Sequence, residues 1–182
     1  MLVPLFLEGP SAEPHAVFTR RRADLRRHAG EISFPGGRRD PEDADLKETA
    51  LRETEEEIGL PRAAVSLLGE LPPTSTIATN YLIHPFVGLV SVERRWRTSP
   101  REVDAVLELP LRALGEARTR RRLERRGISF ETEVYVLGEH LIWGATARIL
   151  ENLLERIDSL IPPSRQGRPR DSPTPSRSRR SS

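Results

Sequence analysis

The sequence predicts an α+β fold, an α/β/α arrangement in which a mixed β-sheet lies between helices. The chain contains many short apolar or alternating segments that suit strands, and only two long amphipathic patterns that suit helices. The helical patterns do not alternate with the strands one by one, so a regular parallel βαβ sheet is not expected. The length of 182 residues matches one domain with a core of ordinary size.

The expected strands are short and are bounded by turn residues. They span residues 2–7, 16–19, 31–34, 65–70, 81–92, 103–109, 128–137 and 140–143. Pro85 lies within 81–92, and because proline cannot donate a ladder hydrogen bond, part of that segment should be an edge or a bulge. The arginine-rich run 118–126 is interpreted as a solvated loop, with shielding of a polyanionic substrate as the alternative.

Helices are expected at 44–58 and 145–161, with a short helix starting near Pro110. The buried stripe of the first helix is marked by four residues at intervals of four: Leu46, Ala50, Thr54 and Ile58. Asp43 or Asp45 could cap its start, and Gly59 suits the left-handed position that follows a helix.

Three carboxylates lie close together near the end of this helix. Glu53, Glu56 and Glu57 are spaced i, i+3 and i+4, so they share one face. Like charges at this spacing repel by roughly a few tenths of a kcal/mol each, and the helix macrodipole disfavours anions at a C-terminus. Such conflicts with local rules are expected where a site is built, and a bound divalent cation would remove them. An ordinary solvated acidic face is the alternative.

The surroundings of these carboxylates favour a metal site. Arg52 precedes Glu53 and can hold its carboxylate through a bidentate pair. Gly36 and Gly37 permit close backbone approach, so the carbonyl of Gly37 could join the metal. The chain has no cysteine, which excludes disulfides and thiolate sites, and the remaining oxygen ligands suit Mg²⁺ or Mn²⁺.

The stretch Arg52–Leu60, RETEEEIGL, resembles the second half of the Nudix box, R-E-U-x-E-E-x-G-U, and Gly37 resembles its opening glycine. Two features depart from the general box. Eight residues separate Asp43 from Arg52 where seven are usual, and Thr54 stands where an aliphatic residue is usual. The longer spacing resembles that of one subgroup, the coenzyme A diphosphatases.

An upstream pattern also resembles this subgroup, F-T-x-R followed by R-x3-G-x3-F-P-G-G. It is matched by FTRR at 18–21, Arg26, Gly30 and FPGG at 34–37, while Arg22 departs from the small residue expected after Arg21. Further similarity lies at 85–88, 102–103, 109–111 and 142–147, and the resemblance covers about residues 2–157.

The resemblance implies a Nudix-type α/β/α sandwich and metal-dependent hydrolysis of a diphosphate linkage. For coenzyme A or acyl-coenzyme A, the products are 4′-phosphopantetheine, or its acyl form, and adenosine 3′,5′-bisphosphate. Glu53, Glu56 and Glu57 would be the metal ligands, Arg52 would orient Glu53, and one of these glutamates or a later one would be the base. Another nucleoside diphosphate derivative, such as ADP-ribose or NADH, is the alternative substrate.

Cations are needed beside these carboxylates, because carboxylates alone would repel an anionic diphosphate. Arg21, Arg26 and His28 are the candidates, since they shortly precede the glycine pair in the sequence. A solvated basic turn is the alternative for all three.

A few other side chains could contribute but have simpler interpretations. Glu102, Glu131 and Glu133 could reach a metal from neighbouring strands, although exposed strand positions are expected for them. Trp143 and Tyr135 are expected in or at the edge of the core rather than stacked on a base.

The C-terminal segment 162–182 differs in composition from the preceding residues 1–161. It has six Arg and one Asp, a charge of +5, which leaves 23 basic and 26 acidic residues, or −3, in 1–161. Because it consists mainly of Pro, Ser and Arg, we expect a disordered tail after a domain that spans 1–161. The high pI comes partly from this tail, so nucleic acid is not the expected partner. A non-enzymatic module whose tail binds RNA, lipid or an acidic protein is the alternative.

Nothing in the sequence indicates a membrane segment. No run of about 18 apolar residues occurs, and the N-terminal apolar run is short and lacks a basic leader. We predict a cytoplasmic enzyme with a small-molecule substrate, and a homodimer is compatible with the sequence.

Overall fold

The computed structural model describes residues 1–24, 30–76, 81–91, 95–125 and 127–160. The predictions for Arg26, His28 and the tail 162–182 therefore lie outside the described residues.

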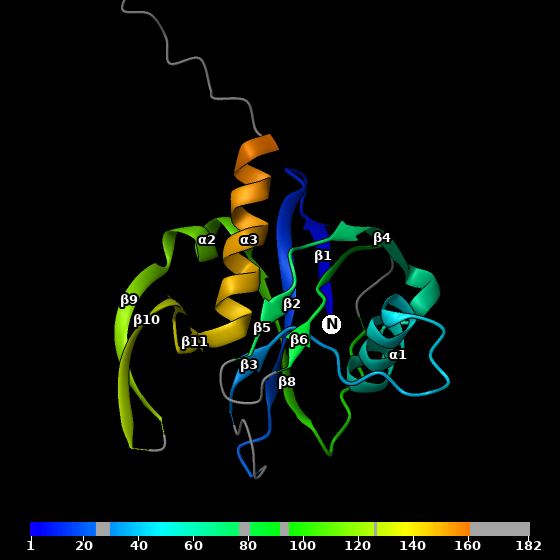
Figure 1. The fold of residues 1–182 in the computed structure, drawn as a ribbon. Helices are drawn as coiled ribbons and strands as arrows, with labels where there is room; N and C mark the ends of the chain where they lie inside the picture. The colour runs from blue at the N-terminus through cyan, green and yellow to red at the C-terminus, as the bar shows by residue number, and fades with distance from the viewer. Residues whose placement is uncertain (25–29, 77–80, 92–94, 126, 161–182) are drawn as a thin grey trace, which may run out of the picture.

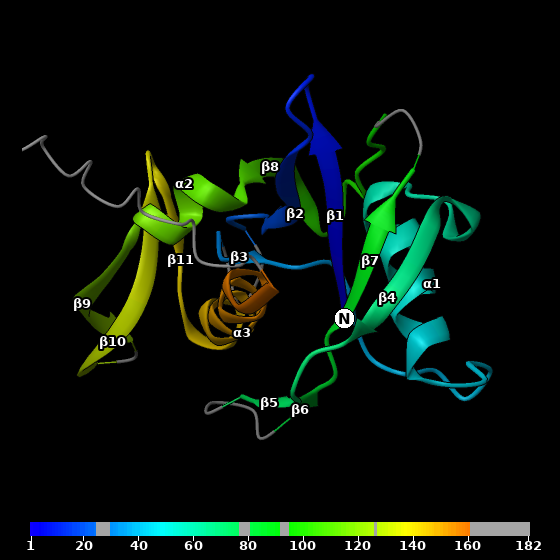
Figure 2. The same ribbon diagram turned by 90° about the horizontal axis from the view of Figure 1, so that it is seen from above.

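A mixed sheet of six strands forms the centre of the fold (Figures 1 and 2). Its strands are β1 (Leu2–Glu8), β2 (Glu13–Arg21), β3 (Ile32–Ser33), β4 (Val65–Glu70), β7 (Phe86–Val90) and β8 (Val103–Pro110). Five of them follow the order β3-β2-β1-β7-β4, and β8 pairs with β2. β1 runs parallel to β7 and the other pairs are antiparallel, so the sheet is mixed as predicted.

Helices cover both faces of this sheet. α1 (Leu46–Ile58) lies on one face and α3 (Gly144–Leu160) on the other, as both views show. Leu2 joins Ala50 in the apolar cluster beneath α1, whereas its neighbour Val3 joins the cluster beneath α3. This division follows from the strand geometry, because successive residues point to opposite faces. The predicted α/β/α arrangement is confirmed.

A second sheet of three strands stands beside α3 (Figure 2). It consists of β9 (Arg118–Arg125), β10 (Ile128–Leu137) and β11 (His140–Ile142), with β10 in the middle. The loop predicted for 118–126 is therefore wrong, because 118–125 form a strand. Its register places Arg120 opposite Glu133 and Arg122 opposite Glu131. The ion pairs run diagonally across this register, from Arg118 to Glu133 and from Arg120 to Glu131, and they offset the like charges of a run that did not indicate a strand.

Pro85 divides the predicted strand 81–92 into two strands in different sheets. β6 (Leu82–Ile83) pairs with β5 (Thr74–Ser75) in a small hairpin, and the chain after Pro85 enters the main sheet as β7. The short helices η1 (Arg62–Ala64) and α2 (Leu111–Glu116) complete the described elements, and α2 agrees with the helix predicted near Pro110. Within the described ranges, no helix is long and apolar enough to cross a membrane.

Candidate active site

Helix α1 has a polar N-cap at its start and a glycine directly after its end. It begins at Leu46, two residues later than predicted, with Asp45 as its N-cap. The Asp45 carboxylate accepts hydrogen bonds from the N–H groups of Lys47 and Glu48, each at 2.9 Å. The helix ends at Gly59, which follows it with a φ of 70° in the left-handed region.

The buried face of α1 agrees with the predicted stripe except at its start. Ala50, Thr54 and Ile58 are buried. Thr54 is tolerated in an aliphatic position because its Oγ1 donates to the carbonyl of Ala50 at 2.7 Å. Leu46 is 37% exposed, so its predicted burial is wrong. The first turn is held by the Asp45 cap rather than by core packing.

The glycine turn before α1 is positioned by the sequence pattern that precedes it. Phe18 and Phe34 stack in the core with ring centroids 4.4 Å apart. Thr19 Oγ1 donates to the carbonyl of Ser33 at 3.2 Å. These contacts tie β3 to β2 and so fix the place at which Gly36 leaves the sheet.

Glu57 is buried beneath this turn. Its side chain is 7% exposed, and its Oε2 accepts a hydrogen bond from the N–H of Gly36 at 3.1 Å. Burial raises the pKa of Glu57 to about 7, a rise that the Gly36 N–H and the charge of Arg21 oppose only in part. Burial therefore disfavours the ionised form of this carboxylate.

Glu53 lies against the second glycine of the turn. A Cβ on Gly37 would lie 2.6 Å from Glu53 Oε1 and closer to Oε2, so only glycine leaves room for the carboxylate. Burial raises the pKa of Glu53, while Arg52, whose Nη2 donates to Oε1 at 3.0 Å, opposes this rise. The two carboxylates Glu53 and Glu57 thus contact adjacent residues of one turn.

Arg52 is held in place by a buried carboxylate. Its Nε and Nη2 donate to the two oxygens of Asp43 at 2.9 and 3.0 Å, which is a bidentate pair. Asp43 is 4% exposed and also accepts hydrogen bonds from Thr49 Oγ1 and the Asp40 N–H. The Arg52 guanidinium holds the pKa of Asp43 well below its usual range. Asp43 is therefore the anchor of the arginine that contacts Glu53, and not the helix cap.

Glu56 occupies a different environment from the other two glutamates. Its side chain is 61% exposed, and its carboxylate accepts a hydrogen bond from Arg52 Nη1 at 3.2 Å. Among the residues that the structure describes, no three His, Cys, Asp or Glu side chains are grouped so that they could hold a metal ion. Glu53 and Glu57 lie at the glycine turn, whereas Glu56 is exposed and paired with Arg52, so the structure does not gather the three predicted carboxylates around one point.

Arg21 is the predicted substrate cation that the structure brings to this site. Its charge lowers the pKa of Glu57, and its Nη1 lies 3.8 Å from Glu102 Oε2. Its Nε is buried and has no hydrogen-bond partner within the described ranges. Glu102 raises the pKa of Glu57, so this carboxylate also belongs to the site. The positions predicted for Arg26 and His28 lie outside the described residues.

The segment 95–102 connects Glu102 to the end of α1. The N–H of Ser99 donates to the backbone carbonyl of Glu57 at 2.8 Å. The carbonyl of Glu102 accepts a hydrogen bond from the N–H of Arg22 at 3.0 Å. Backbone contacts therefore fix this segment to both the acidic helix and the end of β2.

Two further candidate ligands lie away from α1. Glu131 and Glu133 belong to β10, where they pair with Arg120 and Arg118 across the strand. Glu131 is exposed, as expected, whereas Glu133 is half-buried. Tyr135 of the same strand is 2% exposed and lies in the core, as expected.

One cation next to the glycine turn, Arg38, was not predicted. The backbone carbonyl of Arg38 accepts a hydrogen bond from Arg52 Nη2 at 3.2 Å. The guanidinium group of Arg38 lies 4.7 Å from the ring centroid of Tyr81. Its position directly after Gly37 was the available signal.

The donors of this site fit a hard divalent cation. Glu53 and Glu57 offer carboxylate oxygens and Gly37 offers a backbone carbonyl, the ligand types that Mg²⁺ and Mn²⁺ prefer. Burial raises the pKa values of both glutamates, and the charges of Arg52 and Arg21 oppose this rise only in part. A bound divalent cation would favour their ionised forms.

The family model for the NUDIX domain matches residues 3–129. The chain belongs to the Nudix family. A relative from Photorhabdus laumondii, described as the uncharacterized Nudix hydrolase NudL, is 39% identical over 147 residues, which are 80% of this chain and 78% of the relative. A relative of the same name from Salmonella paratyphi B is 38% identical over 147 residues and is covered to 76%. The chain is thus a Nudix hydrolase, an enzyme.

Solved Nudix structures share the fold. RenU, a Nudix hydrolase from M. smegmatis, superposes with a TM-score of 0.62 at 14% identity, over 90% of this chain and 87% of RenU. The NUDIX domain of Shewanella oneidensis NrtR, solved with ADP ribose, gives a TM-score of 0.54 at 14% identity and 86% coverage of both chains. At these identities the similarity confirms the Nudix fold.

Proposed function

We propose that this Nudix hydrolase cleaves the diphosphate linkage of coenzyme A or acyl-coenzyme A with Mg²⁺ or Mn²⁺ as cofactor. The products are 4′-phosphopantetheine, or its acyl form, and adenosine 3′,5′-bisphosphate. One observation carries the proposal. The F-T-x-R and F-P-G-G residues, which resemble the coenzyme A diphosphatase pattern, are the ones that place the glycine turn and Arg21 around Glu57.

The cation is assigned to the carboxylates at the glycine turn. Glu53 and Glu57 would hold it together with the carbonyl of Gly37, and Glu56, which is exposed and paired with Arg52 on the same helix, would join them as a third ligand. The bound cation supplies neutralisation of charge on the diphosphate oxygens and activation of water. Since diphosphate cleavage builds charge on oxygen, electrostatic stabilisation of this kind is expected to supply most of the rate enhancement.

The remaining side chains position the reactants. Arg52, anchored by Asp43, keeps the Glu53 carboxylate against the glycine turn. Arg21, whose charge lowers the pKa of Glu57, is assigned to the anionic oxygens of the substrate. The base that receives the proton from water is one of the α1 glutamates or Glu102.

A substrate panel tests this proposal. Purified protein with Mg²⁺ or Mn²⁺ is incubated separately with coenzyme A, acyl-coenzyme A, ADP-ribose and NADH, and the products are separated by chromatography. Release of adenosine 3′,5′-bisphosphate from coenzyme A is expected. Cleavage of ADP-ribose or NADH without cleavage of coenzyme A would reject the substrate and retain the reaction class. A Glu57→Gln variant prepared identically shows whether release arises from this site.

The tail, the cytoplasmic location and the homodimer stay predictions. We propose that residues 162–182 do not contribute to catalysis. A variant that ends at residue 161 should retain the kcat/KM of the full chain for coenzyme A. Loss of activity on truncation would show that the tail is part of the working enzyme.

A further inference from the structure

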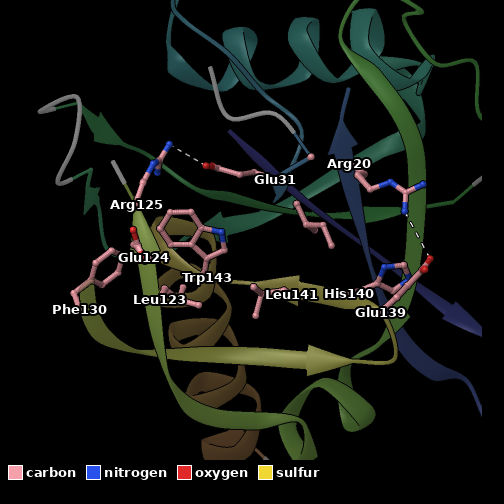
Figure 3. A pocket seen from close by; sticks show the side chains of 12 residues that line it. Arg20, Glu31, Leu123, Glu124, Arg125, Phe130, Glu139, His140, Leu141 and Trp143 are labelled. Atoms are coloured by element: carbon pink, nitrogen blue, oxygen red, sulfur yellow. Dashed lines mark ion pairs between the residues drawn. The ribbon is translucent and has the colours of Figure 1, made fainter. Parts of the chain in front are cut away.

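A cavity of about 420 Å³ lies between the edge of the main sheet, at β2 and β3, and the second sheet (Figure 3). Cavities of this size hold small organic ligands. The cavity is separate from the candidate active site, because neither the glycine turn nor the glutamates at 53, 56 and 57 line it. The site described above therefore leaves it without a role.

One part of the cavity wall is apolar. Five side chains contribute to it: Ile32, Leu123, Phe130, Leu141 and Trp143. The rings of Phe130 and Trp143 lie 6.2 Å apart, and Figure 3 shows the indole projecting among the lining side chains. This wall suits the methylene, methyl or acyl groups of a ligand.

The charged part of the wall carries a small negative excess. Glu31, Glu124 and Glu139 oppose Arg20 and Arg125, so three carboxylates and two guanidinium groups give −1. Both guanidinium groups are already paired, and Arg20 also binds Asp104 outside the cavity, with its Nη2 2.9 Å from Oδ2. Arg125 Nη2 lies 2.9 Å from Glu31 Oε1, and Arg20 Nη1 lies 3.7 Å from Glu139 Oε1 (Figure 3).

These charges select against a phosphate. A phosphate in the cavity would have to displace a carboxylate from each arginine. A neutral ligand leaves the ion pairs intact, and its amide groups can donate to carboxylates and accept from guanidinium groups. The chemistry of the cavity thus fits a neutral chain that combines amide and apolar groups.

The cavity and the active site are built on the same short segments. Ile32 lines the cavity, and four residues later the N–H of Gly36 binds Glu57, a span of at most about 14 Å for an extended chain. On β2, Arg20 lines the cavity, while the charge of its neighbour Arg21 lowers the pKa of Glu57 in the active site. An arm equivalent in length to about four extended residues, roughly 14 Å, can bridge the two places.

We propose that this cavity binds the pantetheine arm of a coenzyme A substrate, together with its acyl group where one is present. The inference rests on the proposed function. The arm is neutral, carries two amide groups and is long enough to cover a span of at most about 14 Å. The negatively charged 3′-phosphoadenosine end of the substrate consequently lies outside this cavity.

Fluorescence of Trp143 gives a direct test. The chain has two tryptophans, and Trp96 lies in the cluster beneath α1, so a Trp96→Phe variant leaves Trp143 as the only indole. Titration of this variant with pantetheine should give a saturable change in emission, and adenosine 3′,5′-bisphosphate should give none. Absence of a saturable change with pantetheine, or a change with the bisphosphate alone, overturns the inference.

A substitution that fills the cavity gives the second test. Leu123→Trp should raise the KM for coenzyme A about tenfold with a much smaller effect on kcat, and should weaken pantetheine binding measured by calorimetry. Ile128→Trp, on the same hairpin but 68% exposed and outside the cavity, is the matched control and should change neither.

The two proposals fail in different ways. Failure of the wild-type enzyme to cleave coenzyme A rejects the proposed function, and with it this inference. Cleavage of coenzyme A with an unchanged KM and unchanged pantetheine affinity in a folded Leu123→Trp variant rejects the cavity assignment alone. Should that variant not fold, the titration of the Trp96→Phe variant decides.

Discussion

Replacing Gly37 by alanine should separate catalysis from stability. The new Cβ would lie 2.6 Å from Glu53 Oε1, so this oxygen must retreat by about 0.8 Å to reach an ordinary contact of 3.4 Å, and Oε2 must retreat further. A misplacement of about 1 Å can lower the rate about 100-fold. The atoms that must move are at the end of a flexible side chain, so the unfolding free energy should fall by only about 1 kcal/mol, the cost of a strained rotamer.

The measurement compares kcat, Mn²⁺ affinity and the urea unfolding midpoint of Gly37→Ala with those of the wild type, on whichever nucleotide the wild type cleaves. Gly69→Ala is the control, because a Cβ there meets no atom within 4 Å. A loss of activity confined to the Gly37 variant supports the placement of Glu53. A Gly37→Ala enzyme that retains wild-type kcat and Mn²⁺ affinity would refute it.

Three other substitutions probe different parts of the site. Glu57→Gln should lower kcat by orders of magnitude. Because burial raises the pKa of this carboxyl to about 7, the variant should unfold no earlier than the wild type in metal-free buffer at pH 8. Asp43 has a lowered pKa in the folded protein, so it stabilises the fold above its unfolded-state pKa of about 3.9, and this stability is lost on acidification. Asp43→Asn should therefore lose less stability than the wild type between pH 6 and pH 2.5 in urea titrations, and an equal loss would contradict the pairing with Arg52. Gly59→Ala should destabilise the protein by about 1–2 kcal/mol in urea unfolding, because φ is 70° there, whereas Gly115→Ala, where a Cβ meets nothing within 4 Å, should not.

The parts of the site that lie on one short segment could be predicted from the sequence. Glu53 and Glu57 share a helix face because of their spacing. Gly37 lies where the Glu53 carboxylate comes too close to the backbone for any side chain. The anchoring role of Asp43 was not predicted, because an aspartate before a helix is also a good cap. Glu102 was considered only as an outside candidate, since its proximity to Arg21 depends on the pairing of β8 with β2.

The same distinction applies to the fold. The α/β/α layers follow from the periodicity of strands and helices, which each segment carries by itself. The strand at 118–125 depends instead on its partner, because only the register with β10 shows that Arg120 faces Glu133. Similarly, Pro85 indicated an irregularity in 81–92, but its division between two sheets depends on contacts distant in the sequence.

Backbone hydrogen bonds close a ring around the active site. The N–H of Gly36 meets the carboxylate of Glu57, whose own carbonyl accepts from Ser99. Three residues later the carbonyl of Glu102 accepts from Arg22, which follows Arg21 at the end of β2. Each contact joins a main-chain atom to a fixed position in another segment.

The ring constrains the lengths of the segments that form it. Inserting one residue into 31–36 or 95–102 would shift the hydrogen-bonding groups of that segment out of register. The exposed turn at 9–11 between β1 and β2 has no such partners elsewhere in the described part of the chain. We therefore expect active homologues to differ in length at that turn and to keep the same length in 31–36 and 95–102. Engineered insertions, such as a peptide tag, belong at the same turn.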